Sequence, residues 1–301
     1  MKSIALSEEK DGFYGFFKPV NSNAAIILCA EKGLITKAWT KWLNKMEVSV
    51  LSVTPNKEIN GCHNWPLEHI ESAVKFLKEK GYTKIGICGI SIGTIIALSA
   101  ASVLEDITLT IALTPMDYVL WGYVKDGSKE KPVIGESLLT WRNNPLPYVP
   151  PPCADPEYWQ MIEKESKRRG DMIASKELFD AAEEKHSIEE SEWIKVENIR
   201  GRLFMAGSED DVLWNTCRGI KRMKERLEKS NSDCIVEAPI YKHCTHFIFP
   251  EGMIKCILPI GIFNFLLPKI FKEAKGYVKE CQESRIDIDN RISAMIKEWI
   301  K

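Results

Sequence analysis

The chain has 301 residues, of which 45% are hydrophobic, and its formal net charge at pH 7 is −1. This length and apolar content allow one large domain or two ordinary ones, and the balanced charge gives no indication of nucleic-acid binding. The N-terminus lacks the apolar core and the small-residue cleavage site of a secretory signal. No apolar run is long enough to span a bilayer, because the longest, 256–267, is interrupted by Pro259, Gly261 and Asn264.

Nine cysteines are scattered along the chain, and none forms a C-x-x-C pair. A structural zinc site is therefore not expected. The odd number and irregular spacing fit reduced thiols better than a disulfide framework. We therefore expect a cytoplasmic protein.

Apolar runs and amphipathic stretches alternate, which is typical of βαβ units and a largely parallel sheet. We expect strands at 13–19, 24–30, 48–53, 84–88, 107–113, 203–206 and 234–240. We expect helices at 36–46, 67–79, 94–101, 215–229 and 287–300, and a polar loop at 54–65. The sequence thus predicts an α/β fold with helices on both faces of the sheet.

The character of the sequence changes between about residues 116 and 200. Five prolines cluster between 145 and 152, and charged helical sequence follows at 156–169 and 175–184. We interpret 116–200 as a cap-like insertion over a sheet edge, within a single domain that covers residues 1–301.

The most specific motif is Gly89-Ile90-Ser91-Ile92-Gly93, which reads G-x-S-x-G between a predicted strand and a predicted helix. In that context a serine becomes an exposed nucleophile on a sharp turn, and the helix N-terminus below it favours developing negative charge. The alternative is an ordinary strand–helix turn in which Ser91 serves as a cap. The rest of the chain must decide between these two interpretations.

A serine nucleophile needs a base and an acid, which follow it in the order Ser, Asp or Glu, His in α/β-hydrolase arrangements. The chain has five histidines: His63, His69, His186, His243 and His246. The first two precede Ser91, and the third lies in the charged insertion. We favour His246 over His243, because an apolar stretch follows it and could fix the imidazole. A metal site that uses both residues as an H-x-x-H pair lacks an evident third ligand.

Acidic residues cluster just after the predicted strand 203–206, at Glu209, Asp210 and Asp211. One of these carboxylates would orient the base, and one of the two aspartates should be a turn or cap residue. Asp117 is another possible acid, although a helix cap after Pro115 is the simpler interpretation. For the oxyanion hole, we expect the backbone N–H of Ile92 and a second donor near Glu31 or Lys32.

With these residues in place, the chain resembles the C-terminal catalytic domain of the acyl-CoA thioester hydrolases and bile acid-CoA:amino acid N-acyltransferases. This family belongs to the dienelactone-hydrolase-like α/β hydrolases. The resemblance spans about residues 13–299. It is best in 12–19, in 67–74 leading to the G-x-S-x-G motif, in Asp210-Asp211-Val212-Leu213-Trp214 and in Thr245-His246-Phe247-Ile248.

The resemblance implies an α/β-hydrolase fold, with Asp211, the second aspartate of D-D-x-x-W, as the acid and His246 as the base. It also implies hydrolysis, because the thioesterases use serine where the N-acyltransferases generally use cysteine. The chain departs from the family in three places. We expect no counterpart of the N-terminal β-sandwich domain before Phe13, Ala30-Glu31-Lys32-Gly33 replaces a glycine-rich loop, and the bulky Ile92 follows the serine.

We therefore expect a serine hydrolase that cleaves an acyl thioester of the acyl-CoA type, without a cofactor or metal. Its partner would be the small-molecule acyl ester or acyl-CoA, and neither nucleic acid nor a membrane is expected. A carboxylesterase or peptidase-like hydrolase and a non-catalytic binding protein are the alternatives. Lys164, Lys167, Arg168 and Arg169 could meet coenzyme A phosphates, but a solvated helical face is the simpler interpretation.

Overall fold

A computed structural model of the protein describes residues 2–29, 33–54, 61–127 and 129–301. Within them, the central sheet has nine strands: β1 (Ile4–Leu6), β2 (Gly15–Lys18), β3 (Ala24–Cys29), β4 (Ser49–Val53), β7 (Lys84–Ile90), β8 (Ile107–Leu113), β13 (Arg202–Ser208), β14 (Ile235–Glu237) and β15 (Ile240–Tyr241). Their order is β1-β2-β4-β3-β7-β8-β13-β14, and β15 also pairs with β13. Among these strands the pairs β1–β2 and β2–β4 are antiparallel and the other pairs are parallel, so the expected largely parallel sheet is confirmed.

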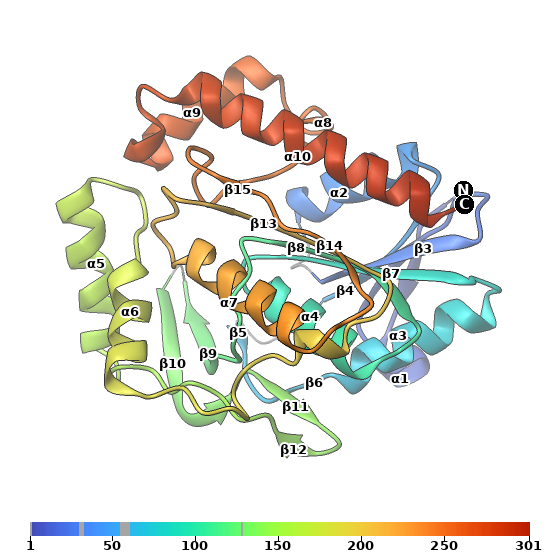
Figure 1. Cartoon of the computed structure of the whole chain (residues 1–301), viewed down its shortest axis with the longest axis horizontal. Coiled ribbons are helices and arrows are strands. Elements are labelled where there is room, and N and C mark those ends of the chain that lie inside the picture. The colour runs from blue at the N-terminus through green and yellow to red at the C-terminus, as the bar shows by residue number, and fades with distance from the viewer. Residues whose placement is uncertain (1, 30–32, 55–60, 128) are drawn as a thin grey trace.

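Helices cover both faces of this sheet (Figure 1). One face carries α1 (Glu8–Asp11), α3 (Glu68–Glu79), α4 (Gly93–Val103), the short η1 (Val196–Asn198) and α7 (Thr216–Lys229). The other carries α2 (Leu34–Lys45), α8 (Glu251–Ile254), α9 (Ile260–Ile270), η2 (Lys272–Ala274) and α10 (Val278–Trp299). Successive strand side chains point to opposite faces. Strand β3 accordingly sends Ile27 into the core beneath α3 and α4, and Ile26 into the core beneath α2 and α10.

The segment between β8 and β13 contains the two expected helices, α5 (Glu157–Arg169) and α6 (Lys176–Lys185). It also contains strands that we did not expect: β9 (Trp121–Asp126), β10 (Lys129–Ser137), β11 (Leu139–Trp141) and β12 (Asn144–Pro145). Part of the expected polar loop joins them, because β5 (Gly61–Cys62) pairs with β9 and β6 (Trp65–Pro66) pairs with β11. The remainder of that loop, 55–60, lies outside the described residues.

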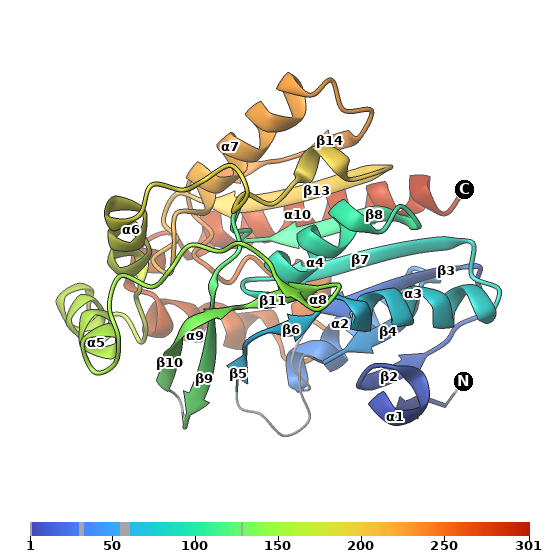
Figure 2. The ribbon, with the colours of Figure 1, turned by 90° about the horizontal axis from the view of Figure 1, so that it is seen from below.

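The insertion lies at the carboxyl ends of the central strands rather than over an edge of the sheet (Figure 2). Its position follows from the connection, since the insertion begins where β8 ends and returns to its neighbour β13. The carboxyl ends of the strands are where open α/β sheets bind ligands.

Two further elements differ from expectation. The strand expected at 234–240 is split into β14 and β15, with Pro239 between them, because a proline has no N–H to donate to a sheet. Helix α10 begins at Val278, nine residues before its expected start. Among the described helices, none has both the length and the apolar character needed to cross a bilayer.

The turn from β7 into α4 is tightly packed against its surroundings. A Cβ added to Gly89 would lie 2.2 Å from the carbonyl oxygen of Gly93, and one added to Gly93 would lie 2.4 Å from the carbonyl oxygen of Cys29. Both distances are far shorter than a van der Waals contact. The neighbouring atoms belong to the backbone and cannot move aside. Glycine at both positions therefore lets α4 start directly against β7 and β3.

Replacing Gly93 with alanine should destabilise the protein by about 1–3 kcal/mol, because the new methyl group forces backbone apart. The matched control is Gly261→Ala in α9, where an added Cβ meets nothing within 4 Å. That variant should be neutral or slightly stabilising, because alanine favours a helix more than glycine does. Urea unfolding of both variants measures the difference, and equal stabilities would contradict this account of the turn.

Candidate active site

Ser91 lies at the turn between β7 and α4, at the carboxyl end of the sheet. Its φ is +55°, in the left-handed region that L-residues with a side chain rarely adopt. Its N–H donates to the carbonyl of Leu113 at 3.0 Å, and its carbonyl accepts from the N–H of Thr94 at 2.9 Å. The backbone thus holds the residue in a strained conformation. Ser91 does not cap α4, because Ile92 is the N-cap residue and Ser91 directs its hydroxyl elsewhere.

The Ser91 hydroxyl is hydrogen-bonded to His246. The Oγ lies 3.0 Å from Nε2 of the imidazole, across 155 positions of sequence. The other ring nitrogen, Nδ1, lies 3.0 and 2.9 Å from the two carboxylate oxygens of Asp211. Because a carboxylate can only accept, Nδ1 donates to Asp211 and Nε2 is left to accept from Ser91. Such an arrangement can draw the proton from a serine hydroxyl.

His246 and Asp211 are almost completely buried, whereas Ser91 is only partly buried. The Asp211 carboxylate also accepts from the backbone N–H of Leu213 at 2.9 Å. The Trp214 ring stands edge-on to the imidazole, with centroids 5.0 Å apart. Packing against Trp214 and hydrogen bonds to Asp211 therefore hold the imidazole in place beside Ser91.

Asp210 has the role of a turn residue that we expected for one of the two aspartates. Its Oδ1 accepts from the backbone N–H groups of Cys244 and Thr245, at 3.2 and 2.7 Å. It also accepts from the hydroxyl of Ser208 at 2.5 Å. Thr245, directly before His246, has a φ of +61°. Asp210 thus ties the loop after β13 to the loop that carries His246.

His243 is partly buried in the loop after β15. Its ring stacks on Tyr277 with centroids 3.7 Å apart, and its Nδ1 lies 3.5 Å from Asp210. The structure therefore does not bring His243 and His246 together as a pair of metal ligands. Within the described residues, no group of three or more His, Cys, Asp or Glu side chains could hold a metal ion.

The remaining histidines have other partners. His63 lies 2.6 Å from Glu136, His69 lies 2.8 Å from the carbonyl of Gly12, and His186 lies 2.8 Å from Glu192. The sequence set aside His63 and His69 because they precede Ser91, and His186 because it lies in the charged insertion.

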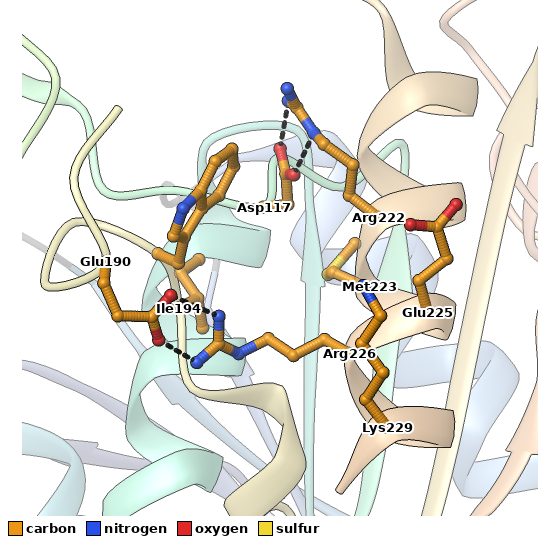
Figure 3. A pocket seen from close by; sticks show the side chains of 9 residues that line it. Asp117, Glu190, Ile194, Arg222, Met223, Glu225, Arg226 and Lys229 are labelled. Atoms are coloured by element: carbon orange, nitrogen blue, oxygen red, sulfur yellow. Dashed lines mark hydrogen bonds and ion pairs between the residues drawn. The ribbon is translucent and has the colours of Figure 1, made fainter. Parts of the chain in front are cut away.

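Asp117 is neither an alternative acid for His246 nor a helix cap. Its carboxylate forms a bidentate ion pair with Arg222, at 2.6 and 2.9 Å, as Figure 3 shows. Arg222 also bonds to Glu183 of α6. Burial raises the pKa of Asp117, and the positive charge of Arg222 opposes that rise. This pair fastens the start of the insertion to α7.

A pocket of about 300 Å³ lies beside this pair, lined by Asp117, Trp193, Arg222, Arg226 and residues around them. Figure 3 shows this pocket from close by. Neither Ser91, Asp211 nor His246 lines it. Arg226 is paired with Glu190 and Glu197. The pocket is therefore separate from the candidate active site, and its arginines are already neutralised.

Of the expected oxyanion donors, only Ile92 can be described. In the parts of the chain that the structure describes, no acceptor is found for its backbone N–H, as a donor reserved for a ligand requires. Glu31 and Lys32 lie outside the described residues.

The sequence did not indicate an aromatic series that links the insertion to His246. Neighbouring ring centroids lie 5.0 to 6.0 Å apart in the order Tyr158, Trp121, Phe179, Trp214, His246. Such pairs add to the energy of apolar burial. In the sequence, only Trp214 of D-D-x-x-W pointed to this series. No local sequence pattern indicated the aromatic residues that pack against it.

The basic run of α5 is only in part a solvated face. Arg169 binds the buried Glu165 at 2.8 Å, and Arg168 binds Glu177. Lys164 and Lys167 are exposed. Two of the four cations thus have structural partners.

The comparisons with known proteins identify the family. The model of the family described as "BAAT / Acyl-CoA thioester hydrolase C terminal" matches residues 65–256, well over half of the chain. The chain belongs to this family. The match confirms the expected resemblance, and Ser91, Asp211 and His246 all lie within it. As a BAAT-type domain, the chain is an enzyme of the esterase and thioesterase class of hydrolases. A search of curated proteins finds no match.

Solved structures agree on the fold of this BAAT-type domain. The α/β hydrolase MGS-M1, from a Medee basin deep-sea metagenome library, is 13% identical with a TM-score of 0.52, and the alignment covers 99% of this chain and 97% of that one. A putative esterase from Staphylococcus aureus is 11% identical with a TM-score of 0.50, and the alignment covers 94% and 82%. The expected α/β-hydrolase fold is confirmed.

Replacing Arg222 with methionine should destabilise the protein by about 3–5 kcal/mol, because Asp117 would keep a buried and unpaired charge. Urea unfolding measures this loss. The double variant Asp117→Asn/Arg222→Met should lose less. Arg142→Met is the control, since Arg142 pairs with Glu71 on the surface and its removal should change stability little.

The loss in Arg222→Met should also depend on pH. Without the arginine, the pKa of Asp117 rises further above its unfolded value, so the folded state binds the extra proton and gains stability as the pH falls. The deficit should therefore be smaller at pH 5 than at pH 8. A deficit that is independent of pH would contradict the role assigned to Asp117.

Proposed function

We propose that the protein is a serine hydrolase that cleaves an acyl thioester of the acyl-CoA type through an acyl-enzyme. The observation that carries the proposal is the hydrogen-bonded series from Asp211 through His246 to Ser91. The family match, whose description names acyl-CoA thioester hydrolases, supports the thioester as substrate.

In the proposed reaction, the Ser91 Oγ attacks the acyl carbonyl while its proton passes to Nε2 of His246. Asp211 holds the imidazole in the required tautomer and stabilises the imidazolium. The tetrahedral oxyanion accepts from the N–H of Ile92 and from a second donor near Glu31. When the intermediate collapses, the C–S bond breaks and the thiolate leaves with the proton from His246. Water, deprotonated by His246, then attacks the acyl-enzyme, releases the carboxylic acid and returns Ser91 to its starting form.

We further propose that residues 116–200 form a cap within a single domain and shape the acyl pocket. Two observations support this role. The segment lies at the carboxyl ends of the strands (Figure 2). Its Phe179 ring packs against Trp214, which in turn packs against His246. The basic run of α5 is not assigned to coenzyme A, since Arg168 and Arg169 already have acidic partners.

A fluorophosphonate probe tests the mechanism directly. Wild-type protein should be labelled at Ser91, and Ser91→Ala should abolish labelling. His246→Ala and Asp211→Asn should each slow it by about a thousandfold or more, because the serine loses its oriented base. Labelling rates are measured by mass spectrometry on samples whose folding is checked by circular dichroism.

Asp117→Asn is the matched control, since it removes a buried carboxylate that does not contact His246. It should leave the labelling rate within a few-fold of wild type. Absence of labelling in folded wild-type protein would favour a non-catalytic binding protein. Unchanged labelling in His246→Ala would overturn the assignment of the base.

Substrate class is tested by turnover of acyl-CoA thioesters over a range of chain lengths, beside p-nitrophenyl esters of the same acyl groups. We expect the thioesters to have the higher kcat/KM, with Ser91→Ala at background for both. Cleavage of the esters without any turnover of acyl-CoA would make the protein a carboxylesterase instead. The serine mechanism would then stand, and the thioester assignment would fail.

A further inference from the structure

Helix α9 exposes large apolar side chains to solvent. Ile262, Phe265 and Leu266 are 51%, 64% and 42% exposed, and their spacing places them on one face of the helix. Leu267 is the one residue of α9 that is fully buried. Figure 1 shows α9 on the outside of the molecule, at the same end as α5 of the insertion.

A polar network on the inner side of α9 fixes this orientation. The side chain of Asn264 accepts from the guanidinium of Arg285 at 2.6 Å and donates to Gln282 at 2.8 Å. Arg285 is fully buried and also bonds to the buried Glu251 at 3.2 Å. Rotating α9 to bury its apolar face would leave Arg285 with fewer partners. The inner side of α9 thus holds Asn264 against Arg285 beside the buried Leu267, while Ile262, Phe265 and Leu266 face solvent.

The loop between α5 and α6 extends this apolar face. Met172 is 71% exposed, and its N–H donates to the carbonyl of Ile270 at the end of α9. The backbone N–H of Lys272 donates to Asp171 of the same loop at 2.7 Å. We call Met172, Ile262, Phe265 and Leu266 the α9 face. It spans the insertion and the C-terminal helices.

Positive charge is concentrated in the segment that carries most of the α9 face. Exposed lysines stand at positions 255, 269, 272, 275 and 279, and Glu273 is the single acidic residue between 255 and 279. Glu273 is paired with Arg169 at 3.5 Å. The ammonium group of Lys269 lies 3.8 Å from the centre of the Phe265 ring. The apolar side chains and the cations therefore share one surface.

We propose that the α9 face docks on an anionic lipid surface, with α9 lying in the plane of the interface. Aromatic and aliphatic side chains bordered by lysines are the combination that inserts into the headgroup region and attracts anionic lipids. At 11 residues, α9 is too short to span a bilayer. This inference replaces the expectation, drawn from the sequence, that no membrane is involved.

A second copy of the chain fits this face less well. A two-fold contact brings the same surface of both copies together. The lysines around the face, of which Lys279 is paired with Glu283, would then oppose one another, and juxtaposed like charges disfavour association. A lipid surface supplies the missing negative charge.

The experiment is sedimentation of the full chain with vesicles of phosphatidylcholine alone or of phosphatidylcholine mixed with phosphatidylglycerol. We expect binding to the mixed vesicles and little to the neutral ones. Phe265→Ser should weaken partitioning by about tenfold or more, because it removes an exposed ring that would be buried in the lipid interface. Lys269→Glu should weaken it by at least about fivefold. The readout does not depend on catalysis, so it stands apart from the proposed reaction.

Matched controls are Ile235→Ser in β14, whose side chain is 52% exposed, and Lys224→Glu on the exposed side of α7. Neither should change vesicle binding, and all four variants should hydrolyse a soluble short-chain ester like the wild type. Failure of the wild type to bind mixed vesicles would overturn the proposal. A dimer in analytical ultracentrifugation that Phe265→Ser dissociates would also overturn it, in favour of a second copy.

Discussion

The candidate site depends on one close approach of backbone to backbone. Helix α4 begins against β7 and β3 with no room for a side chain at Gly89 or Gly93. The chain must therefore turn within a few residues, and Ser91 takes a positive φ at the apex of the turn. The hydroxyl is consequently presented above the strands instead of being paired within the sheet. Hydrogen bonds from its backbone to Leu113 and Thr94 hold it there and offset part of the strain.

The two partners of Ser91, Asp211 and His246, are positioned by neighbouring strands of the sheet. Asp211 follows β13 and His246 follows β15, and these two strands are neighbours in the sheet. Adjacent parallel strands place their following loops side by side, so the fold itself brings acid and base together. Asp210 then joins the two loops through backbone hydrogen bonds. Of two consecutive aspartates, one thus holds the backbone and the other holds the imidazole.

Local patterns made much of this predictable. The alternation of apolar runs predicted the parallel sheet, and the G-x-S-x-G motif predicted the turn. Both were predictable because strands and tight turns each require particular residue types at adjacent positions. The order of Ser, Asp and His along the chain could be read directly from the sequence. The choice of Asp211 over Asp210 needed the family resemblance, since either aspartate satisfies the same local pattern.

Features that depend on distant partners were not predictable. The β9–β10 hairpin is rich in charge and shows no apolar alternation, and its pairing with β5 became visible only in three dimensions. Asp117 looked like a helix cap, but its partner Arg222 lies 105 positions away. Asn264 looked like an interruption in an apolar run. It is the contact that binds α9 to Arg285.

Two buried ion pairs occur where a peripheral element meets the sheet domain. Asp117 and Arg222 fasten the insertion to α7, and Glu251 and Arg285 join α8 to α10 beneath α9. Buried ion pairs add little net stability compared with apolar packing of the same volume, because desolvation cancels most of their attraction. Their bonds, however, are directional, whereas apolar contacts allow elements to slide. We interpret both pairs as fixing orientation: one holds the start of the segment 116–200 against α7, and the other holds α8 against α10 beneath α9.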